Sequence, residues 1–106
     1  MKNLIELRDA LRKFTTARDW PQYHTPKNLA MALIVEAAEL VEQFQWMTPE
    51  QSMELNAEQH AAVRDEVADT LIYLVELADV LGIDLIAAAR DKMAKNAVKY
   101  PVGEKH

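Results

Sequence analysis

Two pairs of acidic residues have a spacing that could hold a divalent metal ion. Glu36 and Glu39 form one pair, and Glu66 and Asp69 form the other. In a helix, residues three positions apart project from the same face, about one turn apart. If the two segments pack as antiparallel helices, the four carboxylates can face each other, and such oxygen ligands suit Mg²⁺ or Mn²⁺.

The sequence around these pairs favours a metal site over an ordinary charged surface. Glu36 lies within ALIVEAAEL and Asp69 lies within EVADTLIYLV, where burial is hard to avoid. Clustered carboxylates raise one another's pKa when no counter-charge is present, and a divalent cation removes that cost. Glu42 continues the first pair by three residues. It is either a further ligand or water-positioning base, or a surface residue.

Other catalytic chemistries lack their motifs. No histidine stands three residues after a glutamate, as a di-iron carboxylate bundle would require. Phosphate-binding glycine loops, G-x-S-x-G elbows and H-E-x-x-H helices are also missing. The chain has no cysteine, which excludes disulfides, thiolate zinc sites and a cysteine nucleophile. A cysteine-free chain fits a reducing compartment, so we expect a cytoplasmic protein.

Length and charge restrict the classes of partner. The 106 residues suit a single domain over 1–106. With a formal charge of −5 and no basic stripe, the chain is a poor candidate for binding nucleic acid. No apolar run approaches the roughly 20 residues that span a bilayer, so no membrane partner is expected. A small phosphorylated ligand remains possible, because a metal can supply positive charge.

Proline and glycine residues, which interrupt helices, divide the chain into about four helical segments. We expect helices near 3–18, 26–46, 57–81 and 85–99, with Thr25, Asn56 and Asp84 as N-caps and Gly82 as a stop. No segment alternates apolar and polar residues over a strand's length. The predicted fold is therefore all-α, a helical bundle of about four helices. Segments 26–46 and 57–81 are apolar on more than one face, so we expect them to pack antiparallel and to form the dimer interface.

Two further groups of residues could hold the rest of a phosphorylated substrate. Lys92, Asn96 and Tyr100 recur at four-residue steps and form one polar, partly cationic stripe. An ordinary solvated helix face is the more common explanation for such a stripe. Flat aromatic residues near a metal–phosphate site can stack on a nucleobase, although aromatic residues close the ends of bundles equally often. The aromatic candidates are Trp20, Tyr23, His24, Trp46 and Tyr73.

The residues resemble the MazG-like all-α nucleoside triphosphate pyrophosphohydrolases, and within them the dCTP pyrophosphatase branch. The family signature E-x-x-E followed by E-x-x-D is matched by EAAE and EVAD, with 26 residues between them. The branch resemblance extends over RDWPQYHTPKNLAMAL, VEQFQW, DTLIYLVELA and KMAKNAVKYPV. It therefore covers nearly the whole chain.

This resemblance implies hydrolysis of a nucleoside triphosphate to the monophosphate and pyrophosphate, with Mg²⁺, as a means of cleansing the nucleotide pool. It also implies a homodimer or homotetramer whose sites borrow residues from a neighbouring subunit. The residues that it assigns to metal are Glu36, Glu39, Glu66 and Asp69. Those that it assigns to substrate are Trp20, His24, Trp46, Tyr73, Lys92, Asn96 and Tyr100.

The base and the reaction class stay open at this point. Some relatives place a polar ring residue on the first helix near the base, where this chain has Leu11. A dCTP-like substrate is thus expected first, with dATP or a modified nucleotide as alternatives. The other hypotheses are a phosphohydrolase of a different phosphorylated metabolite, and a non-catalytic helical interaction module.

Overall fold

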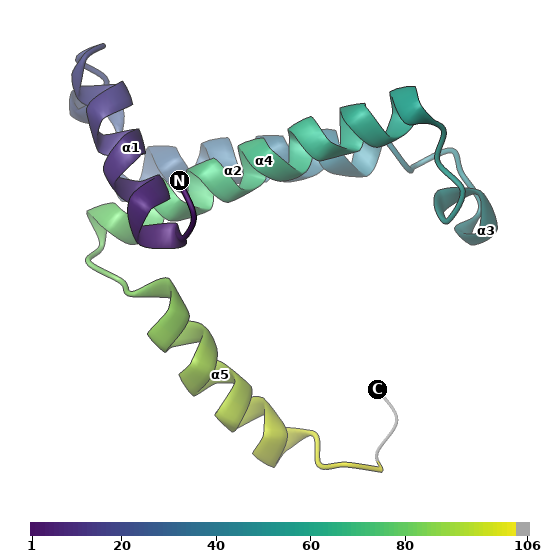
Figure 1. Ribbon diagram of the computed structural model, residues 1–106. Coiled ribbons are helices and arrows are strands. Elements are labelled where there is room, and N and C mark those ends of the chain that lie inside the picture. The colour runs from purple at the N-terminus through teal and green to yellow at the C-terminus, as the bar shows by residue number, and fades with distance from the viewer. Residues whose placement is uncertain (104–106) are drawn as a thin grey trace.

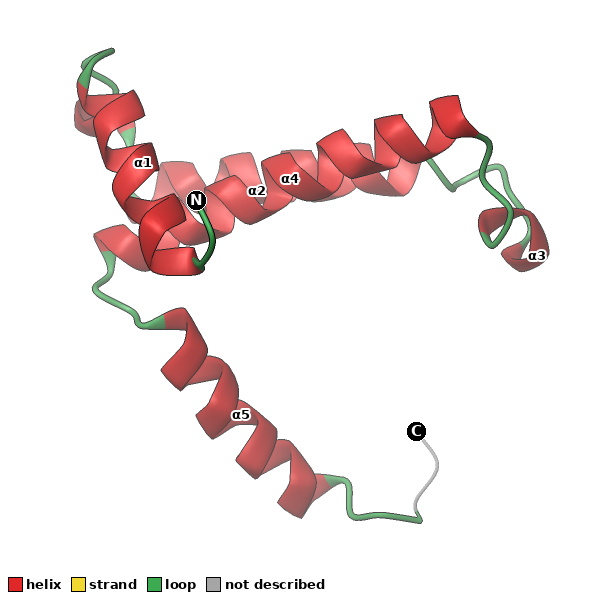
Figure 2. Cartoon of the chain, viewed as in Figure 1, coloured by secondary structure: helices red, strands yellow, loops and turns green. Residues whose placement is uncertain are grey.

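The computed structural model describes residues 1–103, and every regular element in this range is helical (Figure 2). The elements are α1 (Leu4–Thr16), the 3₁₀ turn η1 (Pro21–Tyr23), α2 (Pro26–Glu42), α3 (Pro49–Ser52), α4 (Ala57–Val80) and α5 (Leu85–Lys99). The predicted all-α class is confirmed. Within residues 1–103, no helix combines the length and the apolar character that crossing a bilayer requires.

Side-chain caps explain where the helices begin. In each α-helix the N-cap side chain accepts a hydrogen bond from the backbone N–H three residues later, which satisfies one of the free donors of the first turn. The predicted caps Thr25, Asn56 and Asp84 all act in this way. Gly82 follows α4 with a positive φ of 66°, which favours glycine because it carries no Cβ.

Two helices end earlier in the structure than the sequence predicted. The segment expected to run to residue 46 ends at Glu42, because the next backbone N–H groups bond three residues back, Gln43 to Leu40 and Phe44 to Val41. Such bonds tighten the last turn and stop an α-helix. The first helix ends at Thr16 rather than residue 18, and Asp19 then takes a left-handed φ of 56°.

The long helices α2 and α4 lie side by side as an antiparallel hairpin, and α1 crosses the C-terminal end of α4 (Figure 1). The buried apolar residues at this crossing are Leu29 of α2 with Val75 and Ala78 of α4. Thr15 of α1 is also buried, and its hydroxyl donates to the carbonyl of Leu11 at 3.0 Å. The small core therefore sits where three helices meet.

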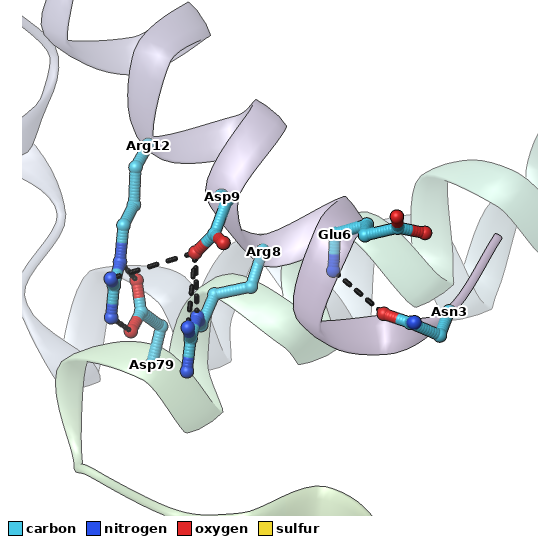
Figure 3. Close-up of polar contacts among 6 residues, drawn as sticks. All are labelled: Asn3, Glu6, Arg8, Asp9, Arg12 and Asp79. Atoms are coloured by element: carbon cyan, nitrogen blue, oxygen red, sulfur yellow. Dashed lines mark hydrogen bonds and ion pairs between the residues drawn. The ribbon is translucent and has the colours of Figure 1, made fainter. Parts of the chain in front are cut away.

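A polar clamp fixes α1 to α4 (Figure 3). The guanidinium of Arg12 donates from Nε and Nη2 to the two carboxylate oxygens of Asp79, at 2.9 and 2.5 Å. This hydrogen bonding lowers the pKa of Asp79 below its ordinary value. Planar two-point pairing of this kind also restricts orientation, so the clamp sets how α1 lies across α4.

Helix α5 points away from the hairpin and buries none of its residues (Figure 1). The hairpin itself leaves a large apolar surface exposed on both long helices. Its exposed apolar residues include Met31, Ile34, Val35 and Val41 on α2, and Val67, Leu71 and Leu74 on α4. Many exposed apolar side chains on the same two helices are typical of a protein interface.

Candidate metal centre

Three of the four predicted carboxylates converge between α2 and α4. Glu36 and Glu39 of α2 and Glu66 of α4 each offer an oxygen, and these oxygens all lie within 4.8 Å of one another. All three residues are half-buried. The antiparallel pairing of the helices brings residues from distant parts of the chain to the same level, while the three-residue spacing keeps Glu36 and Glu39 on one face.

The charges in this cluster repel one another. Burial, followed by the hydrogen bond and negative charge of Glu39, raises the pKa of Glu36 to about 7. Burial also raises the pKa of Glu66, and the charge of Glu39 adds to the effect. Within residues 1–103, no lysine or arginine forms an ion pair with Glu36, Glu39 or Glu66. Among the described residues, the cluster thus has no ion pair that balances its charge.

Two oxygen atoms of the cluster are ready to bind a cation. Oε2 of Glu36 and Oε2 of Glu66 are buried and have no hydrogen-bond partner in the described part of the chain. Buried polar atoms without partners are rare in folded proteins, because they lose their bonds to water and gain nothing in return. Hard carboxylate oxygens are the preferred ligands of Mg²⁺ and Mn²⁺. The donor set therefore fits a divalent metal ion.

The other predicted acids lie at the edge of this group or outside it. Asp69 is exposed and is not among the three converging residues, yet it is close enough to contribute to the raised pKa of both Glu36 and Glu66. Glu42 is exposed at the last position of α2 and is not part of the converging group.

A second set of polar and aromatic residues continues from the cluster along α4. Tyr73 is half-buried one turn beyond Asp69, and burial raises its pKa, with further contributions from Glu76 and Glu36. The next residue on this face is Glu76, whose Oε2 lies 3.9 Å from Nδ1 of His24. The Trp20 ring is 6.3 Å from the His24 ring, centroid to centroid. Trp20, His24 and Tyr73 thus lie near one end of the hairpin.

Sequence reasoning did not assign a role to Glu76. The sequence feature that could have identified Glu76 is its spacing from the other residues. Successive intervals of three, four and three residues separate Glu66, Asp69, Tyr73 and Glu76. This spacing places all four on one face of α4.

The remaining predicted substrate residues are not brought to the cluster within one chain. Trp46 follows the end of α2 and is 89% exposed. Lys92 and Asn96 lie on α5, and Tyr100 is its C-cap. Helix α5, which carries these residues, points away from the hairpin (Figure 1).

The fold and the cluster together define an all-α protein with a candidate divalent-metal centre. The sequence profile of the MazG-like family matches residues 31–106, which is most of the chain. The chain belongs to this family.

Individual relatives agree with this assignment. The chain is 41% identical over 101 residues to dCTP pyrophosphatase 1 of Bos taurus, and 40% identical over 100 residues to dCTP pyrophosphatase 1 of Homo sapiens. These matches cover 93% and 92% of this chain but only 60% and 59% of the relatives. A pyrophosphatase from Archaeoglobus fulgidus has a similar structure, with a TM-score of 0.86 and 47% identity. That match covers 91% of this chain and 90% of the other.

Proposed function

We propose that the chain is a metal-dependent nucleoside triphosphate pyrophosphohydrolase that releases pyrophosphate and a nucleoside monophosphate. The observation that carries the proposal is the carboxylate cluster, in which two buried oxygens have no hydrogen-bond partner within residues 1–103. The dCTP pyrophosphatase relatives support the reaction class and make dCTP the first candidate substrate, with dATP or a modified nucleotide as alternatives. In this proposal residues 1–106 act as one cytoplasmic domain that helps to cleanse the nucleotide pool.

In this mechanism Glu36, Glu39, Glu66 and Asp69 would hold Mg²⁺, or Mn²⁺ in its place. The bound ion would neutralise phosphate charge and lower the pKa of a water molecule. Water attacks the α-phosphorus, a new P–O bond forms, and the bond to the β-phosphate oxygen breaks. A carboxylate of the cluster accepts the proton of the attacking water. The chain then needs no covalent intermediate.

The rest of the nucleotide would extend from this cluster along the hairpin. Trp20, His24 and Tyr73 lie near the end of the hairpin beyond the acids, where the sugar and base would bind. Trp46 follows the opposite end of α2, so the Trp46 that closes over the base would come from a neighbouring subunit. The phosphate-contacting residues Lys92, Asn96 and Tyr100 would come from α5 of a neighbouring subunit, since α5 points away from its own hairpin.

Assembly through the hairpin is part of this proposal, and a charged substitution tests it. We expect a homodimer or homotetramer, in which the exposed apolar residues of α2 and α4 are buried. Ile34 is 66% exposed in the single chain, so Ile34→Asp should fold but place a charge in the subunit interface. Sedimentation velocity should show a shift from oligomer to monomer. A wild-type chain that sediments as a monomer would contradict this part of the proposal.

Product analysis tests the reaction class itself. The chain is incubated with Mg²⁺ and a panel of canonical and modified deoxynucleoside triphosphates, and both products are measured. The expected result is pyrophosphate and monophosphate in equal amounts, with dCTP among the preferred substrates. Release of orthophosphate would show a different phosphohydrolase, and no turnover of any nucleotide would favour a non-catalytic interaction module.

A further inference from the structure

A small cavity lies between α1, η1 and α4, beyond the carboxylate cluster. Its volume is about 170 Å³, and its lining includes Leu11, Thr15, His24, Val75 and Glu76. Sites that enclose a whole small molecule are typically about 300 Å³ or larger. The cavity is therefore suited to one ring of a ligand rather than to a complete nucleotide.

Glu76 supplies an unsatisfied acceptor in the lining of this cavity. Its side chain is only 12% exposed, and its Oε2 is buried without a hydrogen-bond partner. Nδ1 of His24 is 3.9 Å from this oxygen, which is longer than a hydrogen bond. Burial raises the pKa of Glu76 above its ordinary value. Within residues 1–103, Oε2 of Glu76 thus has His24 as a neighbour but no hydrogen-bond partner to offset its burial.

The other charged groups that line the cavity are already paired. Arg12 is bound to Asp79 by two hydrogen bonds, and Arg8 forms an ion pair with Asp9 at 3.0 Å (Figure 3). Within residues 1–103, the oxygens recorded as buried without a partner are those of Glu36, Glu66 and Glu76. The first two belong to the carboxylate cluster. The third calls for a ligand with a hydrogen-bond donor.

The distance along α4 relates this cavity to the carboxylate cluster. Glu76 follows Asp69 by seven residues, which is about 10 Å along a helix and returns to the same face. Tyr73 lies between them, and the negative charges of both residues contribute to its raised pKa. A nucleotide whose α-phosphate sits at the cluster would extend its sugar past Tyr73 and its base toward Glu76.

The chemistry of the nucleobases decides which base fits an acceptor. Cytosine and adenine carry an exocyclic amino group that donates, whereas thymine and uracil carry a carbonyl at the corresponding edge. A glutamate oxygen accepts from the amino group of cytosine but has nothing to accept from a carbonyl. The side chain of Leu11, on the α1 side of the cavity, has no hydrogen-bonding group.

We propose that Glu76, in the cavity between α1 and α4, is the residue by which this chain selects its base. It favours cytosine or adenine, which carry an amino group at the edge facing Glu76, over uracil or thymine, which carry a carbonyl there. The proposal rests on the proposed function and adds to it a named determinant of base preference. His24 then positions Glu76, and the carboxylate cluster, two turns away, acts on the phosphates of every nucleotide alike.

The test compares kcat/KM for dCTP, dATP, dUTP and dTTP in the wild-type chain, Glu76→Gln and Glu76→Ala. Wild type should favour dCTP and dATP. Glu76→Gln keeps the size of the side chain and gains an N–H₂ donor, so it should reduce the dCTP-to-dUTP ratio by about tenfold or more. Glu76→Ala should reduce the same ratio by lowering the dCTP rate. Glu54→Gln, an exposed residue outside the cavity, is the matched control and should keep the wild-type ratio.

Binding of the four monophosphates, measured by calorimetry, tests base selection without catalysis. Loss of the preference for dCMP and dAMP in either folded Glu76 variant supports the proposal, even if no triphosphate is hydrolysed and the proposed function fails. An unchanged preference in a folded Glu76 variant overturns it. A wild-type chain that prefers dUMP or dTMP overturns it as well, whether or not the variants fold.

Discussion

Glu36→Gln is expected to reduce pyrophosphate release by at least about a hundredfold while stabilising the metal-free protein. The loss follows because Glu36 supplies one of the converging oxygens, and removing one preorganised electrostatic group from a catalytic site commonly has an effect of this size. The gain in stability follows because an amide carries no charge to be repelled by Glu39.

Two measurements check this result. Initial rates of pyrophosphate release are compared at saturating Mg²⁺, and melting temperatures are compared in the presence of a chelator near pH 7. Glu58→Gln is the control, because Glu58 is exposed in the first turn of α4 and is not among the converging carboxylates. Wild-type activity in Glu36→Gln, or a lower metal-free melting temperature, would contradict the assignment of Glu36 to the metal centre.

Without metal, the stability of the folded chain should fall as the pH rises from about 4.5 to about 7. The pKa of Glu36 is raised from 4.5 to about 7 in the folded state. In this window the folded chain retains a proton that the unfolded chain gives up, so stability is present at the acidic end and is lost as the pH rises. The raised pKa values of Glu66 and Glu76 act in the same direction.

Added Mg²⁺ should reverse this loss. An ion that binds only the folded state stabilises it by about 2.7 kcal/mol at a hundredfold excess over its Kd, and it binds best once the carboxylates are ionised. Melting temperatures across the window, with chelator and with Mg²⁺, give two curves that should separate toward neutral pH. Parallel curves would show that the cluster does not bind the ion.

Local features were predictable from the sequence. Thr25, Asn56 and Asp84 begin helices as expected, because a cap depends only on residues within one turn. The convergence of Glu36 and Glu39 with Glu66 also follows from short-range rules, since three-residue spacing and a hairpin connection leave few other arrangements. The caps need no knowledge of distant packing, and the convergence of the carboxylates needs only the antiparallel pairing of α2 and α4.

Features that depend on packing between distant segments could not be predicted from the sequence. The end of α2 at Glu42 is decided by a turn rather than by the apolar pattern, which continues past it. The direction of α5 is not determined by its own residues, because none of the residues of α5 is buried within the chain. A role for Glu76 could be proposed only from the structure, in which the turn η1 places His24 beside it.

The isolation of α5 has a consequence for the exchange of its amide protons with solvent. A single helix of 15 residues is only marginally stable in water when nothing packs against it. Its amide protons should exchange quickly in a lone subunit and slowly in the proposed oligomer, in which another subunit would cover the helix. Hydrogen exchange over residues 85–99 would thus report subunit association directly, independently of any assay of the metal centre.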